Sequence, residues 1–326
     1  MHDPVPTPAP RVASLLPAAT EFVAALGQFE RLVGVSHECD HPPAARALPV
    51  LTRPRRDARC AVGSAPGSTA GSTAGSAQDA ARAGDALSVF EVDLEALSRA
   101  APDVILTQSL CEVCAVSRAD VERAAALAAP GARIVDLAPR TLEDVWRDAL
   151  AIGEALGVPD RARELVRERR ERLDGLAARG RRLAHRPRVV TLEWLEPPMI
   201  GGLWMPELIE FAGGRALGAK RGVPAVALGR RELARLAPEI VLIKPCGFDL
   251  EHTFRDVDAW RDLLASLAWP ALRSGDVFVA DGNAFFNRPG PRLVESAEIL
   301  AAVLHGADFG DLVERHAASF TRLARR

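Results

Sequence analysis

The sequence predicts an α/β protein made of two similar lobes that are joined by one long helix. Short apolar segments with strand spacing alternate along the chain with segments of helical spacing. The same alternation begins again after His185-Arg-Pro, as it would in an internal repeat. Between the two halves, a charged helical segment runs from residue 160 to about residue 183, which is roughly 36 Å at 1.5 Å per residue. Two such lobes and a connecting helix form a clamshell.

The first lobe is expected over residues 11–140. Its strands are expected at residues 11–16, 32–36, 101–108 and 132–137, and its helices at 17–27 and 118–129. Residues 58–85 contain repeated Gly-Ser-Thr-Ala, which cannot build a packed core. We expect this segment to be a disordered insertion on the surface.

Connecting helices are expected over residues 141–185, and the second lobe with a terminal helix over 186–326. The first connecting helix begins near Thr141, and its first turn carries two acids, as the helix dipole favours. The Arg- and Glu-rich face of the long helix is expected to point to solvent. In the second lobe, residues 188–192 repeat 11–15, residues 207–214 repeat 21–27, and residues 237–244 repeat 101–108.

Composition limits the class of protein. The chain has 326 residues, enough for two domains, with 48% hydrophobic and 26% charged residues. A net charge of −2 gives no general attraction to nucleic acid or anionic membranes, so no nucleic-acid partner is expected. No segment approaches 18 apolar residues, and the first ten residues lack the pattern of a signal peptide. We therefore expect a cytoplasmic monomer, or a periplasmic or membrane-anchored protein if the start codon is misassigned.

Four of the five cysteines follow predicted strands, where ligands bind in open α/β sheets. They are Cys39, Cys111, Cys114 and Cys246. Four thiolates within reach of one another could bind a metal ion or an iron-sulfur cluster, and the first three are the stronger set. The alternative is that they are buried, inert thiols that pack as small apolar groups.

Two further groups of residues are candidate ligand contacts. The loop after the second strand carries His37, Glu38 and Asp40, which could meet a ligand metal or its amides, while Asp40 could instead cap a helix. Aromatic side chains and an arginine in the second lobe could hold a large flat ligand and its polar groups. These residues are Trp194, Trp204, Phe285, Phe286 and Arg288, with Glu193 beside the first of them.

With these motifs, the chain resembles the substrate-binding proteins of cobalamin and iron-siderophore ABC importers, and most of all the cobalamin-binding branch. The matching motifs include Ser-Leu-Leu-Pro-Ala-Ala-Thr-Glu around Pro17, Gly-Val-Ser-His-Glu-Cys-Asp-His-Pro-Pro, and Phe-Asn-Arg-Pro-Gly-Pro-Arg. The resemblance implies two Rossmann-like lobes, a rigid connecting helix, and a cobalamin or related corrinoid or metal chelate in the inter-lobe cleft, with Pro17 among its contacts. It also implies delivery to an importer permease, with Asp120 and Glu207 as docking acids.

Catalysis is not expected, because the chain contains no P-loop, no Gly-x-Gly-x-x-Gly fingerprint and no Ser-His-Asp signature. Two alternatives remain open from the residues alone. One is a cytoplasmic metal- or iron-sulfur-binding protein that uses the cysteines, and the other is a redox enzyme on the same scaffold.

Overall fold

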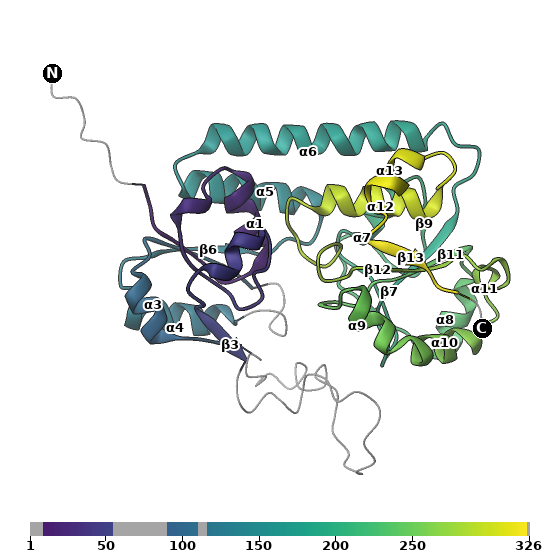
Figure 1. Ribbon diagram of the computed structural model, residues 1–326, viewed down its shortest axis with the longest axis horizontal. Coiled ribbons are helices and arrows are strands. Elements are labelled where there is room, and N and C mark those ends of the chain that lie inside the picture. Colours follow the sequence, from purple (N-terminus) through teal and green to yellow (C-terminus); the bar gives the residue numbers. More distant parts are fainter. Residues whose placement is uncertain (1–8, 55–89, 110–115, 325–326) are drawn as a thin grey trace, which may run out of the picture. The chain divides into compact units, whose positions relative to one another are not determined.

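The computed structural model describes residues 9–54, 90–109 and 116–324, and its alternating helices and strands confirm the predicted α/β class (Figure 1). The expected insertion at 58–85 lies outside the described residues. The chain divides into two compact units. Unit 1 contains Met1–Pro139 and Trp146–Val166, and unit 2 contains Arg140–Val145 and Arg167–Arg326.

Unit 1 is built on a parallel four-stranded sheet in the order β2-β1-β5-β6. Its strands are β1 (Val12–Ser14), β2 (Leu32–Val35), β5 (Val104–Gln108) and β6 (Arg133–Leu137). Its helices are α1 (Pro17–Ala25), α3 (Leu94–Ala100) and α4 (Arg118–Ala128), with 3-10 turns at Phe29–Arg31 and Pro43–Ala47. A small antiparallel pair, β3 (Thr52–Pro54) and β4 (Phe90–Val92), lies outside this sheet. All four predicted strands of the first lobe are therefore present.

Two helices of unit 1, α3 and α4, begin where the sequence supplies a small polar cap. The Asp93 carboxylate accepts a hydrogen bond from the Ala96 amide at 2.9 Å and starts α3. The Ser117 hydroxyl accepts one from the Asp120 amide at 3.2 Å and starts α4. Each bond satisfies an amide that has no partner within its own helix, which is worth about 0.5–2 kcal/mol.

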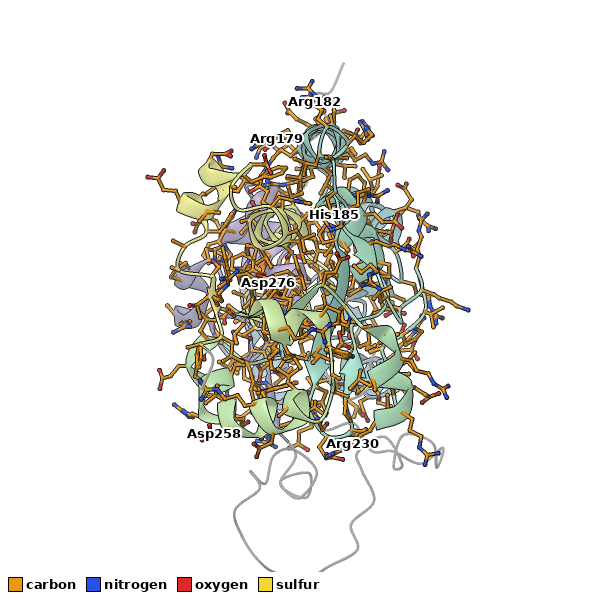
Figure 2. The ribbon with its side chains drawn as sticks, turned by 90° about the vertical axis from the view of Figure 1, so that its right-hand side faces the viewer. Arg179, Arg182, His185, Arg230, Asp258 and Asp276 are labelled. Carbon is orange, nitrogen blue, oxygen red and sulfur yellow. The ribbon has the colours of Figure 1, made fainter. Side chains whose placement is uncertain are left out.

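Unit 2 is built on a seven-stranded mixed sheet in the order β10-β8-β7-β11-β12-β13, with β9 also paired to β7. Its strands are β7 (Arg188–Trp194), β8 (Met199–Ile200), β9 (Arg215–Ala216), β10 (Val226–Ala227), β11 (Ile240–Ile243), β12 (Val277–Ala280) and β13 (Phe320–Arg322). Its helices are α7 (Met205–Phe211), α8 (Arg230–Leu236), α9 (Leu250–Arg255), α10 (Val257–Ala265), α11 (Pro270–Ser274), α12 (Leu293–Leu304) and α13 (Gly310–Arg315). Figure 2 shows Arg182, Arg230 and Asp258 at the outer edge of this unit, where exposed charges remain hydrated.

The predicted internal repeat is present in the backbone. Strands β1 and β5 pair in parallel in unit 1, and β7 and β11 pair in parallel in unit 2. Before each second strand, a short helix ends at an alanine in the left-handed region, Ala101 with φ of 41° and Ala237 with φ of 45°. Each alanine is followed by proline, and the strand begins three residues after the alanine. The repeated Ala-Pro dipeptide therefore marks the same helix-to-strand turn in both units.

Two consecutive helices connect the repeats, and both are shared between the units. Helix α5 spans Leu142–Ala155 and α6 spans Pro159–Gly180. The 22 residues of α6 correspond to about 33 Å of helix. Their polarity is typical of a surface helix, and within the described residues no helix combines the length and apolar character needed to cross a membrane.

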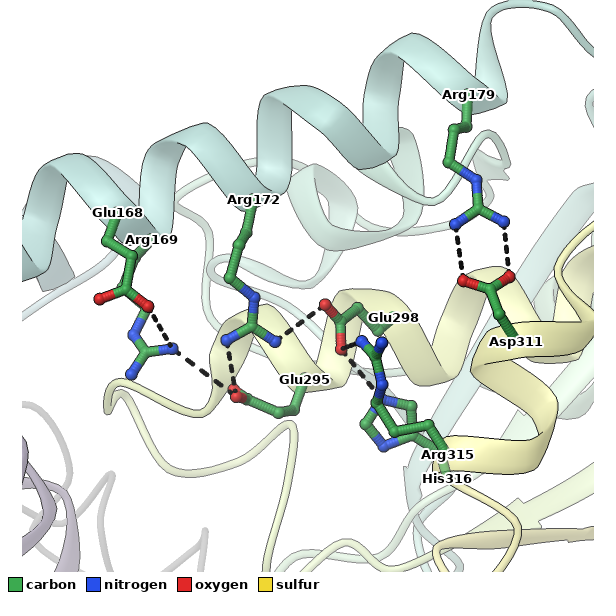
Figure 3. A network of polar contacts seen from close by, with 9 residues as sticks. All are labelled: Glu168, Arg169, Arg172, Arg179, Glu295, Glu298, Asp311, Arg315 and His316. Carbon is green, nitrogen blue, oxygen red and sulfur yellow. Dashed lines mark hydrogen bonds and ion pairs between the residues drawn. The ribbon is translucent and has the colours of Figure 1, made fainter.

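The charged face of α6 is not simply hydrated, and here the expectation of a solvent-facing charge run is partly wrong. In unit 2, Arg172 donates to Glu295 at 3.0 Å and to Glu298 at 2.8 Å, both on α12 (Figure 3). Arg179 forms a bidentate pair with Asp311 on α13 at 2.7 and 2.9 Å. Sequence periodicity could not reveal this, because the acids lie more than 120 positions away.

Glu298 is the most buried acid of this network. Its carboxylate also accepts a hydrogen bond from His316, 3.0 Å away, and both residues are buried. Burial raises the pKa of Glu298, but the bonds from His316 and Arg172 outweigh it and lower the pKa from 4.5 to about 2. The network therefore needs an ionised Glu298.

An acid of unit 1, Asp148, shows the opposite effect. Asp148 on α5 and Asp136 on β6 each keep one buried carboxylate oxygen without a hydrogen-bond partner among the described residues. Burial, and then the charge of Asp136, raise the pKa of Asp148 from 3.8 to about 7.

Candidate functional site

The carboxyl ends of β7 and β11 carry a group of polar side chains in unit 2 that hydrogen-bond to one another. The pairing of these strands continues into the loops, because the Lys244 amide donates to the Leu192 carbonyl at 2.8 Å and the Cys246 amide to the Glu193 carbonyl at 3.2 Å. The side chains of Glu193 and Lys244 are therefore fixed beside each other at the edge where ligands bind in open α/β sheets.

Lys244 is fully buried, and its ammonium group has two strong partners. It donates to Glu193 Oε2 at 2.7 Å and to Asn287 Oδ1 at 2.6 Å. The Asn287 amide in turn donates to the carbonyls of Lys244 at 3.2 Å and Gly282 at 2.8 Å. A buried ammonium is tolerated only when it is paired in this way, so we treat Glu193, Lys244 and Asn287 as one unit, the buried-lysine cluster.

Two glycines leave room for this cluster. A Cβ atom added at Gly201 would lie 2.7 Å from Thr191 Oγ1 and 3.2 Å from both Glu193 Oε2 and the Lys244 side chain. A Cβ atom at Gly282 would lie 2.1 Å from the Pro245 carbonyl oxygen. Larger residues at either position would therefore displace the cluster or its backbone.

The Phe-Asn-Arg-Pro-Gly-Pro loop begins at Phe286, and hydrogen bonds to the backbone of this residue hold the loop in place. Trp204 Nε1 donates to the Phe286 carbonyl at 2.7 Å, and the Phe286 amide donates to the Ser296 hydroxyl at 2.9 Å. Trp204 is 4% exposed and Phe286 0% exposed. Phe286 has a φ of 66°, an uncommon conformation for a bulky residue. In unit 2 these two aromatic side chains are buried and stabilise the loop that carries Asn287, and they expose almost no surface to solvent.

Three other aromatics are more accessible. Trp194 is 37% exposed and meets the Phe248 ring edge-on, with the centroids 5.9 Å apart. Phe285 is partly buried and lies under the guanidinium of Arg292, 5.4 Å from the ring centroid. Edge-on and cation–π contacts of this kind hold the rings in defined orientations.

Arg288, also expected to contact the ligand, is partly buried in unit 2. Its guanidinium donates to Asn283 Oδ1 at 2.8 Å, which ties the loop to the segment just before it. The exposed part of this region therefore combines aromatic surface with fixed polar groups.

In unit 1, His37 is held mainly by residues of strands β3 and β4. Its Nδ1 lies 2.7 Å from the Thr52 hydroxyl, and its ring meets Phe90 edge-on at 4.8 Å. Its Nε2 is buried, 3.3 Å from Glu38 Oε1. Coordination of a ligand metal by Nε2 stays a prediction, and it would require the ring or Glu38 to move.

Pro17 and Asp40 lie shortly after strands β1 and β2 of unit 1. Pro17 is the first residue of α1, whose start has no side-chain cap. The alternative role of Asp40 as a helix cap is not seen, because the 3-10 turn at Pro43–Ala47 has Pro42 at its cap position and no side-chain capping bond.

The cysteine site remains a prediction. Cys39 is 5% exposed in unit 1, with its Sγ 3.1 Å from the Thr20 hydroxyl, whereas Cys246 is exposed in unit 2. Cys111 and Cys114 lie outside the described residues. Within the described ranges, no group of three His, Cys, Asp or Glu side chains is placed to hold a metal ion.

The two expected docking acids both have partners. Asp120 lies in the first turn of α4, accepts a hydrogen bond from the Ser117 hydroxyl at 2.8 Å and pairs with Arg123. In unit 2, Glu207 accepts a hydrogen bond from the Leu142 amide at 3.0 Å and pairs with Arg221 at 3.0 Å. Burial raises the pKa of Glu207 in spite of these partners.

Sequence reasoning missed Lys244, Asn287 and Phe248. A usable signal existed for the first, because Lys244 ends the otherwise apolar run Ile-Val-Leu-Ile and a charge at that point needs a partner. Nothing local to Asn287 or Phe248 indicates their partners, which come from distant segments.

Known proteins of similar sequence and structure have this architecture. The chain is 22% identical to a vitamin B12-binding protein of Vibrio cholerae over 92% of this chain and 90% of that protein. It is 24% identical to a vitamin B12-binding protein of Photorhabdus laumondii over 90% and 88% of the two chains. The crystal structure of periplasmic vitamin B12-binding protein BtuF of Vibrio cholerae superposes with a TM-score of 0.65, at 21% identity, over 93% of this chain and 99% of that one. The apo periplasmic heme-binding protein RhuT of Roseiflexus sp. RS-1 gives a TM-score of 0.66 at 19% identity, over 92% and 99%.

A family model described as periplasmic binding protein matches residues 12–284. This match corrects the expected compartment: the cytoplasmic assignment is wrong, since the family and the solved relatives are periplasmic. The expectation rested on the first ten residues, and the residues that carry the fold say nothing about export. The match supports a role in binding a substrate, and none of these comparisons supports the alternative of a metal- or iron-sulfur-binding protein. Because the match covers most of its length, the chain belongs to the periplasmic binding protein family.

Proposed function

We propose that this chain binds cobalamin or a closely related corrinoid and delivers it to an ABC importer in the membrane. The ligand class is supported by curated relatives named vitamin B12-binding protein that align over about nine-tenths of this chain. The observation that carries the proposal is that an exposed aromatic ring, Trp194, and a fixed carboxylate, Glu193, are adjacent residues at the carboxyl end of β7.

The chemistry of this region fits a corrinoid. A corrin ring is large and apolar on its faces, and carboxamide groups surround its edge. Trp194 and Phe248 offer ring surface for the apolar part, and Glu193 offers a fixed hydrogen-bond acceptor for the edge. Sites for such ligands combine mostly apolar walls with a few fixed polar groups.

Calorimetric titration of the purified full-length protein with cyanocobalamin tests the ligand. We expect saturable binding that is tighter than binding of hemin or of a ferric hydroxamate siderophore. The absence of binding heat at tens of micromolar cyanocobalamin, which corresponds to an affinity weaker than roughly −6 kcal/mol, would refute the proposal.

Docking to the importer is proposed to use Asp120 and Glu207. In cells that depend on this protein for cyanocobalamin uptake, Asp120→Ala and Glu207→Ala are expected to slow uptake without changing the affinity of the purified protein for cyanocobalamin. Asp160→Ala is the matched control, because Asp160 also lies in the first turn of a helix and pairs with an arginine three residues later. Equal uptake by all three variants and wild type would exclude these acids as docking residues.

A further inference from the structure

We propose that Glu193, fixed by Lys244 and Asn287, selects ligands with carboxamide edges over ligands with carboxylate edges. This inference rests on the proposed function, because it assumes a large metal chelate as the ligand. It goes further by naming the group in unit 2 that separates a corrinoid from a haem.

A ligand at the carboxyl end of β7 meets the negative charge of the Glu193–Lys244 pair. Lys244 is 0% exposed, whereas the Glu193 side chain is 19% exposed. The positive partner is therefore hidden beneath the negative one. A ligand at this edge meets the carboxylate and not the ammonium, although the pair as a whole is nearly neutral.

Only one of the two Glu193 carboxylate oxygens is bound to the lysine, which leaves the other to accept hydrogen bonds from a ligand. The Lys244 ammonium binds Oε2 of Glu193. The described residues give no hydrogen bond to Oε1 of the same carboxylate, and that atom is not among the buried unpartnered atoms. A carboxylate has about four acceptor positions, so Oε1 can accept N–H groups from a ligand while Oε2 stays bound to the lysine.

The Glu193 carboxylate is also rigidly held. Lys244, Asn287 and the close packing at Gly201 hold the Glu193 carboxylate in one place. A fixed acceptor loses little side-chain entropy when it binds a ligand. The same contacts prevent the carboxylate from turning away from an unsuitable ligand.

An exposed negative charge, an available acceptor oxygen and a rigid position together allow Glu193 to distinguish ligands by the charge of their peripheral groups. The carboxamides of a corrinoid donate N–H groups, which an ionised carboxylate binds strongly. The propionates of a haem are anionic, and they would meet a like charge with no donor between the two. A hydrogen bond to a charged group typically changes affinity by about 10- to 100-fold.

The main variant is Glu193→Gln. The glutamine carbonyl can still accept the Lys244 bond, while its NH₂ group replaces Oε1 as the atom that faces the ligand. The atom of residue 193 that faces the ligand then changes from a hydrogen-bond acceptor to a donor. We expect cyanocobalamin to bind about 10- to 100-fold more weakly and hemin binding to stay equal or strengthen, so that the ratio of the two affinities falls by at least tenfold.

The matched control is Glu210→Gln, which removes one exposed negative charge from α7 of the same unit. It is expected to leave the affinity ratio unchanged. Because Glu193→Gln leaves Lys244 with a weaker partner, the variant could unfold. The double substitution Glu193→Met with Lys244→Met removes both charges at similar volume, which cores tolerate well. It is expected to lower the ratio as Glu193→Gln does.

The outcomes separate the two proposals. If wild type binds cyanocobalamin and the ratio stays unchanged in both Glu193 variants, the inference fails and the proposed function stands. If wild type binds hemin and not cyanocobalamin, the proposed function fails, and the inference fails with it because the carboxylate has not excluded propionates.

Discussion

Replacement of Trp194 by alanine should weaken corrinoid binding by an amount that follows from the exposed area of the ring. Trp194 is 37% exposed, and a tryptophan side chain buries roughly 150–250 Å² when fully covered. About 55–95 Å² therefore remain for a ligand to cover. At about 25 cal/mol per Å², this area is worth about 1.4–2.4 kcal/mol, or a 10- to 50-fold change in dissociation constant. Calorimetric titration of the variant with cyanocobalamin measures it.

Phe254→Ala is the matched control for this experiment. Phe254 is also 37% exposed and lies on α9, two residues from His252, whose ring approaches Phe248. Residues two apart on a helix do not share a face, so Phe254 should not join the aromatic surface. We expect less than a threefold change in the control. An equal loss in both variants, or none in Trp194→Ala, would refute the role of Trp194 as a ligand contact.

Three further predictions concern stability and thiol reactivity. The interactions that lower the pKa of Glu298 stabilise the fold above pH 4.5, and this stabilisation is lost as the pH falls toward about 2. The free energy of unfolding, measured in urea, should therefore fall less over this pH range in Glu298→Gln than in wild type. The raised pKa of Asp148 acts in the opposite direction: ionisation costs stability as the pH rises from 3.8 through about 7. Asp148→Asn should therefore raise the melting temperature at pH 8 more than at pH 4, and an equal rise at both would contradict the buried-acid explanation. In a variant with the other three cysteines replaced by serine, a thiol reagent should label Cys246 quickly and Cys39 only on unfolding, and equal rates would show that Cys39 is not shielded.

The sequence was sufficient to predict the repeat and the strands that form it, β1, β2, β5, β6, β7 and β11, because both are local patterns, whereas the shorter strands β3, β4, β8, β9 and β10 and the later strands β12 and β13 were not predicted. The Ala-Pro dipeptides before β5 and β11 mark equivalent turns, and the apolar runs that follow are buried in each sheet. Glu193 and Trp194 could also be selected, since their place at a strand end follows from the chain order alone.

The buried-lysine cluster could not be predicted, because its members come from residues 193, 244 and 287 and only tertiary packing brings them together. Aromatic character was also an incomplete guide. Trp194 and Trp204 look equivalent in the sequence, yet one is 37% exposed and the other 4%. The difference depends on which ring finds a buried hydrogen-bond acceptor, and Trp204 finds the Phe286 carbonyl.

The sharing of α5 and α6 between the units determines how this protein can be cut into fragments. Unit 1 includes Trp146–Val166, so a fragment that stops at residue 139 lacks part of its own structure. Among the missing side chains, Trp146, Ile152 and Leu156 are each at most 3% exposed in the intact chain. Such a fragment would expose apolar surface and aggregate, whereas a complementary fragment that begins at residue 140 would carry segments of both units. Recombinant study of unit 1 alone would therefore require a rejoined chain, with a new linker in place of residues 140–145.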